Sequence, residues 1–72
     1  MKGKYIITTS EIPILISEAM NHKDIYPKHW IISAGFFDYD SNNGFKCYGK
    51  SESLNINSRT EDSDVLNIFF KK

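Results

Sequence analysis

The feature that most constrains this chain is a pair of apolar, aromatic-rich runs separated by a polar stretch that ends in Asn43-Gly44. Aromatic and β-branched residues dominate the first run, over 29–39, and favour extended strands. Asn-Gly is typical of the turn between two antiparallel strands. We therefore predict a central hairpin over about 29–56, with a return strand from Phe45 to about Ile56.

The first strand of this hairpin carries apolar side chains on both faces, because successive side chains of a strand point to opposite sides. Such a strand needs cover on both faces, from its own chain or, on one face, from a partner. Gly35, inside the strand, is expected to mark a bulge or a close approach of another backbone. One face is predicted to hold Trp30, Ile32, Ala34 and Phe36, and the other Ile31, Phe37 and Tyr39.

One strand and one helix are predicted before the hairpin. The run from Tyr5 to Thr9 is β-branched and aromatic, which is typical of a short strand. Over about 11–21 the apolar residues recur at the spacing of an amphipathic helix, with Pro13 in its first turn. A strand over Ile12–Ile16 is the alternative, because short apolar runs fit both structures. The residues at helical spacing are Ile12, Leu15, Ile16, Ala19 and Met20.

A second helix is predicted over about 59–71, where Ser58 and Glu61 form a capping box. Its apolar stripe is Val65, Leu66, Phe69 and Phe70. The complete order is β-α-β-β-α in a single α+β domain over 1–72. We expect a three-stranded, mainly antiparallel sheet with both helices on one face and one strand edge left open.

Length and composition favour a chain that gains stability from a partner. A domain of 72 residues usually needs a disulfide, a metal or another chain, and a single cysteine, Cys47, excludes an internal disulfide. A lone cysteine fits a reducing compartment, and no signal-peptide pattern follows Met1, so we expect a cytoplasmic location. No apolar run approaches the roughly 20 residues of a membrane span, so we expect no membrane partner.

Charge and metal-ligand spacing argue against two further classes of function. Nine basic and nine acidic residues give a formal charge of zero, and the composition therefore argues against nucleic acid as a partner. Weak nucleic-acid binding through Lys46, Lys50 and Arg59 is a third reading of the function. His22, His29 and Cys47 match no zinc-binding spacing, and we expect no metal site and no cofactor.

The absence of a catalytic constellation favours a non-catalytic interaction module that associates with itself or with another protein. An uncovered second face of the central strand would expose an apolar patch that soluble monomers rarely tolerate. The predicted interaction surface consists of Trp30, Ile32, Phe36, Phe37 and Tyr39.

The alternative reading is a phosphate-handling protein. Gly49 interrupts a predicted strand, so a ligand could approach the backbone there, beside Lys50 and Ser51. The candidate anion-binding residues are His22, Lys50, Ser51 and Arg59.

Two segments of the chain resemble janus-type phosphohistidine phosphatases. Tyr48-Gly49-Lys50-Ser51 is similar to the Tyr-Gly-x-Ser segment of that family, and the segment from His22 to Tyr26 is similar to the one that carries its catalytic histidine. The resemblance implies that His22 is the catalytic base and that the backbone around Ser51 holds phosphate.

Overall fold

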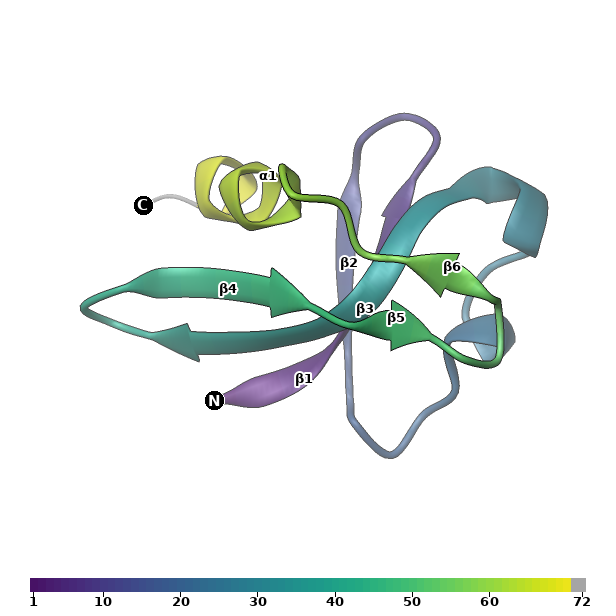
Figure 1. The fold of residues 1–72 in the computed structure, drawn as a ribbon, viewed down its shortest axis with the longest axis horizontal. Coiled ribbons are helices and arrows are strands. Elements are labelled where there is room, and N and C mark those ends of the chain that lie inside the picture. Colours follow the sequence, from purple (N-terminus) through teal and green to yellow (C-terminus); the bar gives the residue numbers. More distant parts are fainter. Residues whose placement is uncertain (71–72) are drawn as a thin grey trace.

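The structure, a computed structural model, describes residues 1–70 and is built around a four-stranded antiparallel sheet in the order β2-β1-β3-β4 (Figure 1). The strands of this sheet are β1 (Lys2–Thr8), β2 (Pro13–Ile16), β3 (Ile31–Asp40) and β4 (Gly44–Tyr48). Two short 3-10 helices, η1 (His22–Asp24) and η2 (Lys28–Trp30), connect β2 to β3. The chain continues as a two-stranded ribbon, β5 (Lys50–Ser51) and β6 (Ile56–Asn57), and then as helix α1 (Asp62–Phe69).

The predicted β-α-β-β-α order with three strands and two helices is wrong, because the helix expected over about 11–21 is a strand, β2. The alternative, a strand over Ile12–Ile16, forms from Pro13 to Ile16. Its isoleucines are β-branched and favour an extended backbone, and a proline is tolerated on an edge strand, where its missing N–H points to solvent. Ala19 and Met20, which complete the helical spacing, lie instead in an exposed turn.

The turn between β1 and β2 determines which backbone groups of β2 point toward β1. Glu11 N donates to Thr8 O at 2.8 Å, and Thr8 N donates to Ile12 O at 3.0 Å. Glu11 closes this loop with φ at 62°, in the left-handed region where glycine is the usual residue. The bond to Ile12 determines which residues of β2 direct their backbone N–H and C=O groups toward β1 and which direct them away from the sheet.

The predicted turn at Asn43-Gly44 does join two antiparallel strands, β3 and β4, although β3 begins at Ile31 and not at residue 29. Asp40 pairs with Gly44 across the turn, and Gly44 has φ at 74°. The Asp40 carboxylate accepts hydrogen bonds from the backbone N–H groups of Asn42 and Asn43, at 2.9 and 2.6 Å. The side chain thus organises the polar turn that the sequence predicts.

The continuous return strand to about Ile56 is wrong, because β4 ends at Tyr48. Gly49, with φ at 76°, changes the chain direction there. The chain then forms the short β5–β6 ribbon, whose turn is closed by Ser51: its Oγ accepts from Leu54 N at 3.2 Å.

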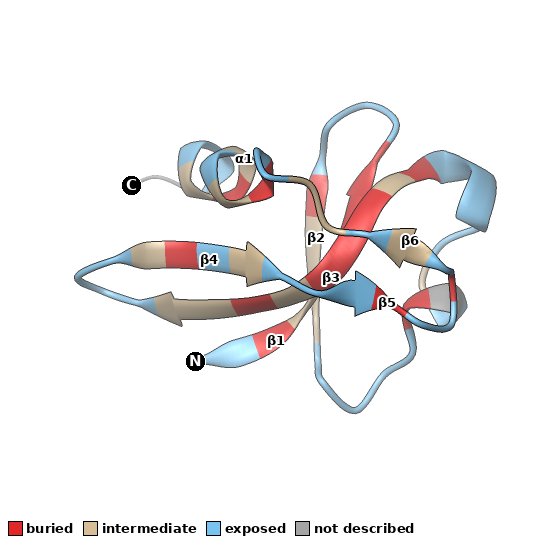
Figure 2. Cartoon of the chain, in the orientation of Figure 1, coloured by how far each residue is buried: buried red, intermediate tan, exposed pale blue. Residues whose placement is uncertain are grey.

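Both faces of β3 are covered within the chain, and β1 and β3 are the most buried strands (Figure 2). On the face toward α1, which we call the α1-side core, the buried residues are Tyr5, Ile7, Phe37, Phe45 and Leu66. On the opposite face, which we call the ribbon-side core, they are Ile6, Ile31, Ala34 and Leu54. The apolar second face of β3 is therefore covered by the chain itself near Ala34, without a partner.

The predicted assignment of side chains to the faces of β3 is wrong at its first residues. A register shift in the β1–β3 pairing, between Ile7 and Thr8, changes the alternation by one residue. Ile31 therefore shares a core with Ala34, and Ile32 packs against the α1-side core. Gly35 does mark a close approach, since a Cβ there would lie 2.6 Å from Tyr48 O.

Helix α1 is shorter than the predicted 59–71 and begins at Asp62; residue 71 lies outside the described residues. The predicted capping box does not form, because Ser58 Oγ donates instead to Gly49 O at 2.7 Å. Leu66 is fully buried, whereas Phe69 is 53% exposed and lies outside the core.

Candidate interaction surface

The two edges of the main sheet differ in how their backbone groups are satisfied. The outer edge of β4 is covered by side chains of α1. Asn67 Oδ1 accepts from Phe45 N at 2.8 Å, and Asn67 Nδ2 donates to Phe45 O at 3.1 Å. Ser63 Oγ accepts from Cys47 N at 2.8 Å. These bonds occupy both outward N–H groups of β4 and the Phe45 carbonyl, and α1 itself lies along this edge, so the edge is blocked to a further strand.

The outer edge of β2 has no such cover among the described residues. Because Thr8 and Ile12 form a hydrogen-bonded pair, the backbone groups of Ile14 and Ile16 point toward β1. Those of Pro13 and Leu15 point away from the sheet by the same alternation. The N–H and C=O of Leu15 and the C=O of Pro13 therefore form an open edge.

A groove of about 470 Å³ lies beside this edge, on the ribbon side of the β1–β2 hairpin. Its apolar lining comes from Ile12, Ile14, Tyr26, Pro27 and Trp30. Trp30 is 51% exposed and Ile12 is 47% exposed, so large apolar surface faces solvent at this place. The open edge and the groove together form the candidate interaction surface.

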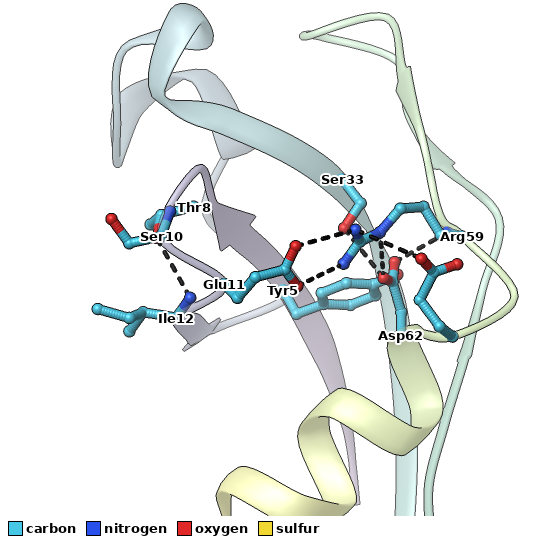
Figure 3. A network of polar contacts seen from close by, with 9 residues as sticks. Tyr5, Thr8, Ser10, Glu11, Ile12, Ser33, Arg59 and Asp62 are labelled. Carbon is cyan, nitrogen blue, oxygen red and sulfur yellow. Dashed lines mark hydrogen bonds and ion pairs between the residues drawn. The ribbon is translucent and has the colours of Figure 1, made fainter.

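A polar cluster fastens the opposite side of the hairpin to α1 (Figure 3). The fully buried Asp62 carboxylate accepts hydrogen bonds from Tyr5 Oη at 2.5 Å, Ser33 Oγ at 3.1 Å, and both the backbone N and Nε of Arg59 at 2.8 Å. The Arg59 guanidinium also pairs with both carboxylate oxygens of Glu11. Every polar group of this cluster thus has a partner, and the cluster holds the first turn of α1 to β1 and β3.

Two ionisable side chains in or beside this cluster, Tyr5 and Cys47, have raised pKa values. Burial, together with the adjacent Asp62, raises the pKa of the Tyr5 phenol far above its usual range. Burial likewise raises the pKa of Cys47 to about 11. The thiol therefore stays protonated and is a poor nucleophile.

The candidate anion-binding residues are only partly brought together. Arg59 is committed to Asp62 and Glu11. Ser51 is fully buried and closes the ribbon turn, and the exposed Lys50 has its Nζ 4.0 Å from Glu52.

His22 is connected to the Tyr48–Ser51 segment through the Phe36 ring, which contacts both. The imidazole is nearly buried, with Nε2 2.9 Å from Gly35 O, and its ring meets Phe36 edge-on. Phe36 also stacks on Tyr48, and its ring lies so near Gly49 that a Cβ at residue 49 would be 3.2 Å from it. Burial, with a smaller contribution from the charge of Lys4, lowers the pKa of His22, so the ring is neutral at pH 7.

The predicted interaction residues lie on different surfaces. Phe37 belongs to the α1-side core, and Tyr39 packs against the Phe45 ring. Phe36 lies on the opposite face, and Ile32 is half-buried. Of this set, only Trp30 lies at the groove.

Comparison with known proteins identifies no relative: no protein-family model, curated protein or solved structure matches the chain. Within residues 1–70, no group of three or more histidine, cysteine or acidic side chains is placed to hold a metal ion. No helix of the described chain is long and apolar enough to cross a membrane.

The sequence predicted neither of two sets of long-range contacts around this surface, those that block the β4 edge and those of the Asp62 cluster. The capping of β4 depends on Asn67 and Ser63, which lie 22 and 16 residues from their partners along the chain. The Asp62 cluster joins residues up to 57 positions apart. No local pattern signals either contact, although the spacing of Ser63 and Asn67 by four residues does place them on one helix face.

Proposed function

We propose that this chain is a non-catalytic interaction module that binds its partner by adding an extended strand to the outer edge of β2. The observation that carries the proposal is the difference between the two sheet edges. One edge is occupied by Asn67 and Ser63, and the other leaves the backbone groups of Leu15 open. In strand addition, the main-chain hydrogen bonds supply affinity and neighbouring pockets select side chains.

The groove beside β2 supports this proposal. It places apolar surface from Ile12, Tyr26 and Trp30 next to the open backbone groups. A side chain of an added strand that points to the ribbon side could enter the groove. Aromatic side chains of this kind are enriched where proteins bind one another.

The chemistry of the polar groups supports a non-catalytic role. The Asp62 carboxylate, which is fully buried, is saturated by hydrogen bonds from Tyr5, Ser33 and Arg59. The Cys47 thiol is held protonated. Catalysis by the Asp62 carboxylate would require breaking contacts that hold α1 to the sheet.

The edge is tested by an NMR titration with a capped peptide of alternating valine and threonine, a sequence-neutral probe for strand addition. The expected result is a set of amide chemical-shift changes concentrated at Ile14–Ser17. A matched peptide, N-methylated at the residues that would pair with β2, should cause none because it cannot donate. Equal shifts at the β4 edge, or shifts with both peptides, would contradict the proposal.

A second candidate function, binding of phosphate, rests on the placement of His22. Its ring is neutral and oriented by the Gly35 carbonyl, and it contacts Phe36, which stacks on Tyr48 of the Tyr48–Ser51 segment. The resemblance to phosphohistidine phosphatases proposes the same residues. Titration with inorganic phosphate should then shift the amides of Gly49, Lys50 and Ser51, and His22→Ala should abolish the shifts. Unchanged amide positions in the original chain would exclude this site.

A further inference from the structure

We infer that the strand added to β2 is β2 of a second copy of this chain, paired antiparallel about a two-fold axis at Leu15. The inference rests on the proposed function, because it names the partner for the same edge. A two-fold axis makes an edge pair with itself, so the edge must be complementary to its own reverse. The open edge of β2 meets this requirement in its backbone and in its side chains.

The backbone groups of β2 match under this pairing. Leu15 and its symmetry mate each donate N–H to the other's C=O, as in a hydrogen-bonded pair of an antiparallel ladder. Pro13 then lies opposite Ser17 of the second copy, whose N–H donates to the Pro13 C=O. Proline lacks only a donor, and an acceptor is all that this position needs to supply.

The side chains of β2 also match. On the α1 side, Leu15 meets Leu15 of the second copy. On the ribbon side, Ile14 meets Ile16 of the second copy, and Ile16 meets Ile14. All three side chains are half-buried in the single chain, so the pairing removes apolar surface from water that the chain itself leaves exposed.

The capped edge of β4 makes this assembly finite. Joining two copies through β2 leaves only the two β4 edges at the ends of the combined sheet. Both ends are blocked by Asn67 and Ser63 of their own chains. The formal charge of zero also means that no net repulsion opposes the association of two copies. The pairing therefore stops at a dimer, whereas two open edges would allow a fibre.

The first test is sedimentation equilibrium across a wide concentration range, with a matched pair of variants at Ser17. The original chain should form a species of twice 8.3 kDa at high concentration. Ser17→Pro removes the N–H that faces the second copy and should weaken the dimer at least tenfold. Ser17→Ala keeps this N–H and loses the same side-chain bond to Ala19, so it should dimerise as the original chain does.

The second test is a disulfide that reports the register, made in a Cys47→Ser background. Two Leu15 Cα atoms in a hydrogen-bonded pair lie about 5.5 Å apart, which a disulfide can span. Leu15→Cys should therefore cross-link under mild oxidation. Ile68→Cys should not, although Ile68, on the outer surface of α1, is 75% exposed. A dimer that cross-links through position 68 and not through position 15 would contradict the inference.

The outcomes separate this inference from the proposed function. A chain that stays at 8.3 kDa at millimolar concentration, without a Leu15→Cys cross-link, overturns the second copy as partner. If the valine–threonine peptide still changes the amide chemical shifts of Ile14–Ser17, the edge remains a strand-addition site for a different chain. If the peptide has no effect and no dimer forms, both proposals fail.

Discussion

Asp62 is the residue whose side chain joins the most distant parts of the chain. It is fully buried, yet its carboxylate is matched by hydroxyl, backbone and guanidinium donors from β1, β3 and the segment before α1. A buried carboxylate without such partners would cost several kcal/mol. Removing the carboxylate in turn leaves all of these donors without their acceptor.

Asp62→Ala should lower the free energy of unfolding by about 3–5 kcal/mol, because it leaves the Tyr5 hydroxyl and Arg59 Nε without their acceptor. Urea denaturation measures this loss. Asp64→Ala is the matched control in the same helix turn, since Asp64 is exposed, and it should change stability by less than about 1 kcal/mol. Equal effects of the two substitutions would mean that the Asp62 cluster contributes little.

Cys47 should react slowly while the chain is folded. Because burial raises its pKa from 9.0 to about 11, iodoacetamide at pH 8 should alkylate it roughly 10- to 100-fold more slowly than in the denatured chain. The raised pKa favours the protonated folded state, so this contribution to stability is complete below pH 9 and is lost as the pH rises toward 11. Alkylation at the rate of the denatured chain would contradict this environment.

At the scale of elements, α1 serves as a cover for the edge of β4. Asn67 makes a paired contact with the backbone of Phe45, and Ser63 satisfies Cys47 N. The helix therefore does more than bury Leu66 against the α1-side core.

Asn67→Ala should destabilise the fold by about 1–3 kcal/mol, because it leaves the backbone groups of Phe45 without partners. It should also open the second edge and allow association beyond a dimer. Chemical denaturation and light scattering measure the two effects. Asn57→Ala provides an exposed asparagine as control. Light scattering that is unchanged in the Asn67 variant would mean that the helix does not block the edge.

Phe69→Ala should lower stability by less than about 1.5 kcal/mol, because the ring is exposed and surface changes are usually small. Leu66→Ala should cost more, about 2–5 kcal/mol, since Leu66 is fully buried. Thermal unfolding of both variants gives the comparison. A larger effect at Phe69 would place this ring in the core.

Sequence patterns predicted the elements whose signals are local and missed those set by distant contacts. The hairpin at Asn43-Gly44 follows from turn chemistry, and the C-terminal helix from its apolar spacing. The strand around Ile14 cannot be distinguished from a helix by spacing alone, because a short continuous apolar run such as Ile12–Ile16 is compatible with both. Ser58 matched a capping box, but its hydroxyl found the Gly49 carbonyl, a contact that only the folded chain creates.

For the molecule as a whole, the candidate site could not be predicted because it depends on which edge is left open. The sequence predicts that one strand edge is open, but it does not identify that edge. The identification requires the strand order β2-β1-β3-β4 and the position of α1. The predicted reason for self-association was an uncovered face of β3. This face is covered around Ala34, where Leu54 and Ile56 pack against it. The open edge of β2 replaces it as the basis for the proposal.

The central claim, that β2 presents the one unblocked edge of the described sheet, is tested most directly by amide hydrogen exchange at single-residue resolution. In dilute solution, the amides of Phe45 and Cys47 should exchange slowly, because Asn67 and Ser63 protect them, and that of Leu15 should exchange fast. At high concentration, Leu15 should become protected by the second copy. Slow exchange of Leu15 in the dilute monomer, or fast exchange of Phe45 and Cys47, would contradict the account.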